Sequence, residues 1–132
     1  MAPKKEIDSR KRALWCVNAS LEKKAKDLVV LRVKEISDFA DYFIICSGTS
    51  DRQVRAIASA IQESLKKSDI LPLGVEGETA GRWVLMDYDD VIIHIFHESV
   101  RSFYELERLW SEAPKMAVPD ETVSIKALPR GI

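Results

Sequence analysis

Two short apolar segments joined by an acidic turn dominate the second half of the sequence. Residues 82–86 and 91–96 are rich in Val, Ile, Leu and aromatic side chains, which is typical of strands. Residues 87–90 between them are Asp-Tyr-Asp-Asp, and Asp is common in turns because its side chain bonds locally to the backbone. The pattern therefore predicts a β-hairpin.

Both faces of this hairpin are apolar. Because successive side chains of a strand point to opposite faces, Trp83, Leu85 and Asp87 share one face. Val84 and Met86 share the other face. A half-solvated antiparallel strand would alternate apolar with polar residues, so each face of this hairpin needs a cover. We expect helices of the chain to cover one face, and either further helices or a partner protein to cover the second.

Apolar positions in the rest of the chain predict three helices and three further strands. Spacings of three and four residues predict helices from residue 8, from residue 50 to about 67, and from residue 99 to Pro114. Strands are predicted at residues 27–33, 42–46 and 72–75. The resulting order, α-β-β-α-β-β-β-α, predicts an α/β fold with a mixed β-sheet of about five strands packed by helices.

Polar residues at the predicted helix starts are candidate caps. Thr49 or Ser50 in the turn at residues 47–50 can accept a bond from the second helix, and Ser99 can accept one from the third. A phosphate could also bind at the turn at residues 47–50. That turn has neither the lysine of a P-loop nor the glycines of a dinucleotide site, so a capped turn is the favoured interpretation.

The length of 132 residues fits one domain with its own core. We divide the chain into a flexible basic leader (1–7), a single α/β domain (8–112) and an extended or disordered tail (113–132). No apolar segment approaches the roughly twenty residues that a membrane-spanning helix needs. The first residues lack the apolar core of a signal peptide, so we expect a cytoplasmic protein without membrane contact.

Charge is unevenly distributed along the chain, although the net charge is only −1. Residues up to Lys26 carry eight cations and three acids, whereas residues 69–90 carry six acids and a single cation, Arg82. An acidic surface attracts a basic partner and repels nucleic-acid phosphates. We therefore expect direct nucleic-acid contact to be secondary at most, and the basic first helix to present a solvated face.

Asp87 and Asp89 are the main candidates for catalysis. Their spacing suits a carboxylate pair that holds Mg²⁺ for phosphoryl transfer, so a magnesium-dependent nucleotidyltransferase-like enzyme is the alternative function. Asp is also common in hairpin turns, which favours a local structural role. His94 and His97 are expected on opposite faces, so His94 is interpreted as a strand histidine with a hydrogen-bond partner. The two cysteines lie among apolar residues and are interpreted as buried thiols.

Trp83 is the strongest candidate for partner recognition. It lies on the second apolar face of the hairpin with acidic residues nearby in the sequence. An aromatic anchor ringed by charge is typical of a protein–protein hot spot. A core aromatic residue is the alternative, and composition does not separate the two.

Six short motifs are spread over residues 14–110. They are Ser37-x-x-x-Asp41-Tyr42-Phe43, Ser47-Gly48-Thr49-Ser50-x-Arg52-x-Val54, Pro72-Leu73-Gly74-Val75-Glu76-Gly77, Trp83-x-Leu85-x-Asp87, His94-x-Phe96 and Arg101-x-x-Tyr104-x-Leu106-Glu107-x-Leu109-Trp110. In this combination the chain resembles the ribosomal silencing factors, also called Iojap-like proteins. The leader and the tail lie outside the motifs.

The resemblance implies a non-enzymatic factor without a cofactor, with a fold related to nucleotidyltransferases whose activity is lost. Such a factor binds the large ribosomal subunit through its protein fourteen, sterically blocks joining of the small subunit and represses translation when nutrients are limiting. Homodimers are implied as well. The resemblance assigns partner contact to Trp83 and its neighbours Arg82, Leu85, Asp87 and Tyr88. Besides the enzyme, a nucleic-acid binder that works through the basic first helix stays open as an alternative.

Overall fold

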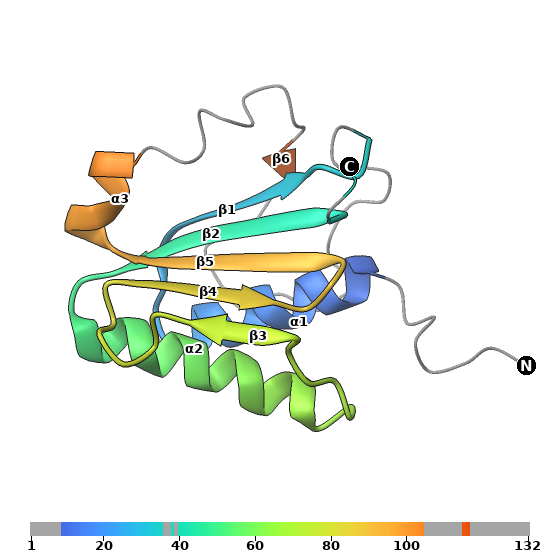
Figure 1. Cartoon of the computed structure of the whole chain (residues 1–132), viewed down its shortest axis with the longest axis horizontal. Coiled ribbons are helices and arrows are strands. Elements are labelled where there is room, and N and C mark those ends of the chain that lie inside the picture. Colours follow the sequence, from blue (N-terminus) through green and yellow to red (C-terminus); the bar gives the residue numbers. More distant parts are fainter. Residues whose placement is uncertain (1–8, 36–37, 39, 105–114, 117–132) are drawn as a thin grey trace, which may run out of the picture.

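One mixed β-sheet organises the chain (Figure 1). The computed structural model describes residues 9–35, 38, 40–104 and 115–116. The helices are α1 (Ser9–Glu22), α2 (Asp51–Lys66) and α3 (Glu98–Tyr104). The strands are β1 (Lys26–Arg32), β2 (Tyr42–Gly48), β3 (Gly74–Glu76), β4 (Trp83–Asp87), β5 (Val91–His97) and β6 (Lys115–Met116). In this part of the chain, the six strands have the order β3-β4-β5-β2-β1-β6.

The centre of the sheet is the parallel pair β2 and β5, and the other neighbouring strands are antiparallel. β2 is buried along its whole length, in agreement with its almost uninterrupted apolar sequence. From β2 the chain passes through α2 to β3 at the sheet edge, and the antiparallel β3, β4 and β5 return it to the centre. The predicted α/β fold with a mixed sheet is therefore confirmed.

The predicted helices and strands are all present, and the structure adds β6. This two-residue strand pairs with β1 and lies in the segment that we predicted to be an extended or disordered tail. Two residues without a periodic pattern give no local signal for a strand. The leader 1–7, the predicted last helix beyond residue 104 and the rest of the tail lie outside the described residues. Among the described residues, no helix has the length and apolar character needed to cross a membrane.

α1 and α2 pack against one face of the sheet (Figure 1). The buried residues of α2 are those of its predicted apolar stripe: Val54, Ile57, Ala58, Ile61 and Leu65. From the sheet, the same core includes Tyr42, Ile44, Cys46, Val84, Met86, Val91, Ile93 and Ile95. Cys16 of α1 belongs to it too, so both cysteines are buried thiols as interpreted.

The two predicted caps have different outcomes. Ser50 caps α2, because the backbone N–H of Gln53 donates to Ser50 Oγ at 3.0 Å. The prediction that Ser99 caps α3 is wrong. β5 runs directly into α3, which begins one residue earlier, at Glu98, and the N–H of Ser99 donates to His97 Nδ1 at 3.2 Å. The histidine ring at the end of β5 therefore takes the place of the expected serine.

Candidate partner-binding face

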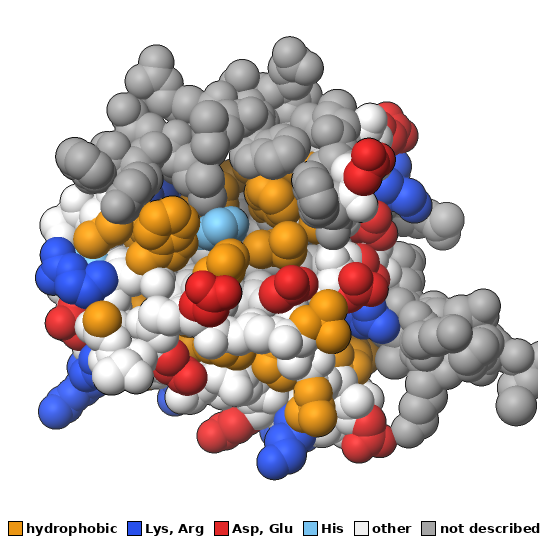
Figure 2. All heavy atoms as spheres, in the orientation of Figure 1, with side chains coloured by type: hydrophobic (Ala, Val, Ile, Leu, Met, Phe, Trp, Pro, Cys, Tyr) orange, Lys and Arg blue, Asp and Glu red, His pale blue; other side chains and the backbone are white. Residues whose placement is uncertain are grey.

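The sheet face opposite α1 and α2 carries a second apolar cluster. Its buried members are Leu31, Val33, Ala40, Phe43, Ile45 and Phe96, and its partly buried members are Val29, Trp83, Ile92 and Val100. Alternation along β3, β4 and β5 places Glu76, Leu85, Asp87 and His94 on the same side. We call this surface the Trp83 face. Figure 2 shows hydrophobic side chains gathered around a histidine on the near side of the molecule, with acidic side chains beside them.

The predicted division of β4 is confirmed. Trp83, Leu85 and Asp87 are partly buried, whereas Val84 and Met86 between them are fully buried in the core beneath α1 and α2. Among the described helices, α3 packs on the Trp83 face through Val100, whereas α1 and α2 pack on the other side. The indole of Trp83 is therefore held by the sheet but retains exposed surface.

Trp83 belongs to a cluster of aromatic rings that spans three strands. It lies directly opposite Phe96 of β5, with the ring centroids 4.9 Å apart. Its Nε1–H donates to Nδ1 of His94 at 3.1 Å. The His94 ring stacks on Phe96 at 6.1 Å between centroids and meets Phe43 of β2 edge-on at 5.8 Å. Because each ring restrains the next, the indole has a defined orientation on this face.

His94 is neutral in the folded protein. Burial lowers the pKa of His94 to about 4, because the charged form loses its hydration inside the cluster. Since Nδ1 accepts the bond from Trp83, the ring proton is on Nε2. The interpretation of His94 as a strand histidine with a hydrogen-bond partner is confirmed. Within the described residues, no group of three or more His, Cys, Asp or Glu side chains could hold a metal ion.

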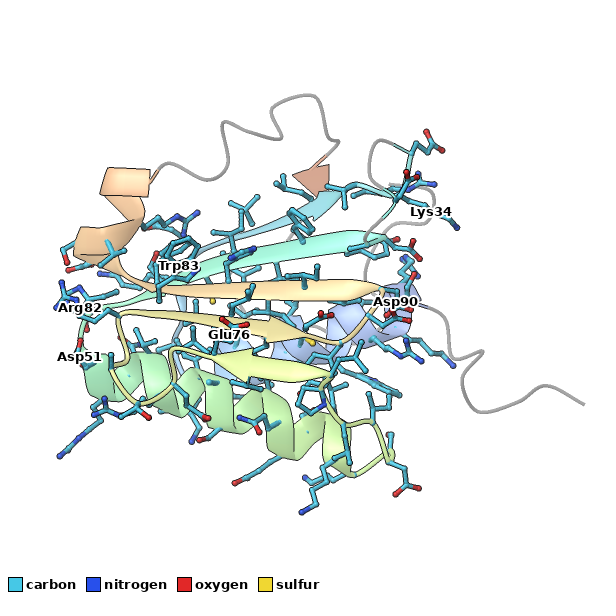
Figure 3. All side chains as sticks on the ribbon, in the orientation of Figure 1. Lys34, Asp51, Glu76, Arg82, Trp83 and Asp90 are labelled. Atoms are coloured by element: carbon cyan, nitrogen blue, oxygen red, sulfur yellow. The ribbon has the colours of Figure 1, made fainter. Side chains whose placement is uncertain are left out.

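The acids of residues 69–90 do not form one continuous acidic surface. Glu76 and Asp87 occupy the alternating positions that lie on the Trp83 face. Figure 3 shows Glu76 and Trp83 on the near side of the sheet. Asp90 is directed toward α1 instead, where its two carboxylate oxygens accept from Arg12 Nη1 at 2.8 and 2.7 Å. The indole therefore shares its face with two of these carboxylates.

Tyr88 does not belong to the Trp83 face, so its assignment to the contact surface is corrected. Its side chain is 2% exposed and lies in the core beneath the helices. Trp83, Leu85 and Asp87 point to one side of β4, and the same alternation sends the next residue to the other side. The N–H of Tyr88 donates to the carbonyl of Val91 at 2.9 Å, which keeps the strand geometry through this position.

Arg82 lies at the rim of the Trp83 face, at the start of β4. Its side chain is 54% exposed, with Nη1 4.0 Å from Asp51 Oδ1 and Nη2 donating to Ser99 Oγ at 3.3 Å. Its carbonyl accepts a bond from the N–H of His97 at 2.8 Å. Figure 3 shows Arg82 and Asp51 at the same end of the sheet, opposite the end that carries Asp90.

The acidic turn has a structural explanation. Asp87 Oδ1 accepts the backbone N–H of Asp89 at 2.8 Å, a local bond typical of turn aspartates. Asp89 has a positive φ of 76°, a conformation that Asp tolerates better than most residues. The Asp87 carboxylate thus fixes the hairpin turn, and the arrangement gives the enzyme alternative no support.

The chain is thus an α/β protein whose sheet is packed by α1 and α2 on one side and carries the partly exposed Trp83 on the other. Comparison with known protein families identifies the family to which the chain belongs. The family model described as "Ribosomal silencing factor during starvation" matches residues 6–130. The chain therefore belongs to the ribosomal silencing factor family, and it is a non-enzymatic regulator of translation that associates with the ribosome.

Individual relatives support this assignment. The ribosomal silencing factor RsfS of Bacillus subtilis is 46% identical over 93 residues, which are 70% of this chain and 79% of that protein. The chloroplastic protein Iojap of Zea mays is 32% identical over 111 residues, which are 83% of this chain and 48% of that protein. A crystal structure of a Chromobacterium violaceum protein superposes with a TM-score of 0.78 at 29% identity, covering 92% of this chain and 98% of that one.

Proposed function

We propose that this chain docks its Trp83 face on protein fourteen of the large ribosomal subunit, in the cytoplasm, when nutrients are limiting. The bulk of the bound domain then obstructs the surface that the small subunit must reach, and translation is repressed. The observation that carries this proposal is the partly exposed indole of Trp83, oriented by His94 and Phe96 on the face that α1 and α2 leave uncovered. Aromatic anchors that a partner covers on binding dominate the binding energy of protein interfaces.

The charges on this face suit a ribosomal protein. Glu76 and Asp87 lie beside the apolar surface of Trp83 and Leu85. Ribosomal proteins are mostly basic, and complementary charge favours encounter and correct orientation. A specific interface needs on the order of 800 Å² per partner, so residues around β4 must contribute beyond the hairpin itself. Tyr88 is left out of the contact set because it is buried beneath the helices.

The proposal is tested by measuring the affinity of the chain for purified large subunits and for isolated protein fourteen. We expect Trp83→Ala to weaken both by about 2 kcal/mol or more, which is about 30-fold, because the truncation removes the anchor. Leu85→Ala should weaken both as well. Leu71→Ala is the matched control, since Leu71 is 66% exposed in the loop beside α2, away from the Trp83 face. Unchanged affinity of a folded Trp83→Ala variant would remove this face from the interface.

A homodimer is part of the same proposal. The Trp83 face offers the apolar surface that a second copy of the chain could use when no ribosome is present. Sedimentation equilibrium of the free chain and of Leu85→Ala tests this. Dimers that persist unchanged in the variant would place the dimer contact elsewhere.

A further inference from the structure

Arg82 is unsuited to a basic partner, although it adjoins Trp83. It belongs to a group of cations at the sheet end where β2 and β5 finish and α2 begins, which we call the basic end. Its members are Lys23, Lys24, Lys26, Arg52, Arg55 and Arg82. Figure 2 shows Lys and Arg side chains gathered at this end of the molecule, next to the hydrophobic side chains of the near face.

Hydrogen bonds at the start of α2 bring these cations together from distant parts of the sequence. Gln53 Nε2 donates to the carbonyl oxygens of Lys23 and Lys24, each at 3.0 Å, so the loop between α1 and β1 lies against the first turn of α2. Arg52 and Arg55 extend from that turn and the next. Arg55 Nη1 donates to the carbonyl of Thr79 at 3.2 Å, which links α2 to the loop before β4.

The strand register relates one of these cations, Lys26, to Trp83. Lys26 lies opposite Ser47, and Ser47 lies beside Phe96, which in turn lies opposite Trp83. One row of paired residues across the sheet thus runs from Lys26 to Trp83. Arg82 precedes Trp83 in the chain and lies just beyond this row. The basic end and the Trp83 face therefore share an edge.

The acids at this end leave an excess of positive charge. Glu22, Asp27 and Asp51 stand among the six cations, which gives a balance of +3 in a chain whose net charge is −1. Arg101 and Glu98 of α3 add one charge of each sign. Lys23, Lys24, Lys26, Arg52 and Arg82 are exposed, so solvent or a partner can reach them. Clustered exposed cations of this kind are suited to the phosphates of nucleic acids, whose contacts position a protein without reading sequence.

We propose that the basic end contacts the phosphate backbone of ribosomal RNA next to the protein on which the Trp83 face docks. This inference rests on the proposed function and adds a second partner of different chemistry to the same binding event. The factor then binds where the ribosomal protein and the RNA meet. The carboxylates of the Trp83 face lie toward the protein, and the guanidinium and ammonium groups of the basic end lie toward the phosphates. The two contacts together fix the orientation of the domain, which steric blocking requires.

The test compares two double variants that remove the same charge. Arg52→Ala with Arg82→Ala removes two exposed cations of the basic end, and Lys66→Ala with Lys67→Ala removes two exposed lysines at the far end of α2. Affinity for purified large subunits is measured at several salt concentrations. We expect the arginine variant to lose about tenfold in affinity. The slope of log affinity against log salt concentration should also become less negative by about one to two, since each lost phosphate contact removes somewhat less than one from it. The lysine variant should match the unmodified chain.

A second measurement separates this inference from the docking proposal. Binding to isolated protein fourteen should be unchanged in Arg52→Ala alone, because Arg52 lies on α2 outside the Trp83 face, but weakened in Trp83→Ala. If Arg52→Ala weakens both complexes equally, the basic end contacts protein rather than RNA. If it weakens neither, or leaves the salt slope unchanged, the basic end has no part in binding. Because Arg82 also pairs with Asp51, thermal unfolding of each variant is compared, and Arg52→Ala alone provides the test should the double variant be unstable.

Discussion

Trp83 and His94 occupy diagonal positions on neighbouring strands and are joined by a hydrogen bond from the indole Nε1–H to the imidazole Nδ1 at 3.1 Å. The bond exists only while Nδ1 is unprotonated, because a protonated imidazole has no acceptor to offer. The indole that we place at the centre of the docking surface is therefore oriented by a group that titrates in acid. Burial keeps that group neutral at physiological pH by lowering the pKa of His94 to about 4.

The first prediction is that stability falls in mild acid through His94. The pKa of His94 is about 4 in the folded state against an ordinary value of 6.5, so the unfolded state binds the proton more readily between these values. The contribution is fully present above about pH 6.5 and is lost as the pH falls toward 4. The loss is on the order of 3 kcal/mol. Urea denaturation at a series of pH values measures it.

His94→Gln provides the control for this pH dependence. The amide oxygen can still accept from Trp83, but the side chain does not titrate. The difference in unfolding free energy between the original chain and His94→Gln should therefore shrink as the pH falls from 7 to 4.5. A difference that stays constant over this range would show that His94 does not control acid stability.

The second prediction concerns Gly77, which precedes β4 with a positive φ of 80°. A Cβ at this position would lie 2.1 Å from the carbonyl oxygen of Trp83, so the backbone at the start of β4 would have to move. We expect Gly77→Ala to cost about 2 kcal/mol or more in unfolding free energy and to weaken ribosome binding by displacing Trp83.

Gly74→Ala is the matched control for Gly77. A Cβ at Gly74 meets no atom within 4 Å and its φ is not positive, so thermal unfolding should change little. Equal effects of the two substitutions would show that the close approach to Trp83 is not what requires glycine at position 77.

The fold could be predicted because the apolar residues of its main helices and strands follow a clear helical or strand pattern. The five-residue stripe of α2 repeats at three- and four-residue steps, and β2 is apolar almost throughout, so helix and central strand were identified without ambiguity. The order of the strands could not be predicted in the same way. β3 lies at one edge beside β4, and β6 at the other beside β1, and such pairings depend on contacts between distant residues.

The part of the candidate site that follows from the alternation of side chains along one strand was predicted. The alternation of side chains along β4 places Trp83 and Leu85 on one face. When the same alternation is continued to Tyr88, it places that residue on the opposite face. The bond between Trp83 and His94 was missed, because it depends on the register of the hairpin. The register follows from a tight turn at Asp89 and Asp90, which sets Leu85 opposite His94, so the turn length was the signal that could have revealed it.

The third prediction concerns the ion pair between Arg12 of α1 and Asp90 of the hairpin turn. Arg12 and Asp90 have side chains that are 12% and 25% exposed, and their charge-assisted bonds tie the hairpin to the helix layer. Asp90→Asn should lower the unfolding free energy by about 2 kcal/mol, because a mostly buried guanidinium then faces a neutral amide. Glu35→Gln is the comparison, since Glu35 is 79% exposed and 3.7 Å from Arg32, and it should cost at most about 0.5 kcal/mol. Similar losses in both variants would contradict a special role for Asp90.

The fourth prediction is that Tyr88→Phe keeps or raises stability and leaves ribosome binding intact. The Tyr88 hydroxyl is buried and has no hydrogen-bond partner among the described residues, and burial raises the pKa of this phenol above its usual range. A buried polar group without a partner carries a desolvation cost of about 1–3 kcal/mol, which the phenylalanine variant avoids while it fills the same space. Urea denaturation should therefore show a midpoint that is unchanged or higher. Lower stability would reveal a hydrogen-bond partner for the hydroxyl. Weaker ribosome binding would show that Tyr88 belongs to the contact surface despite its burial.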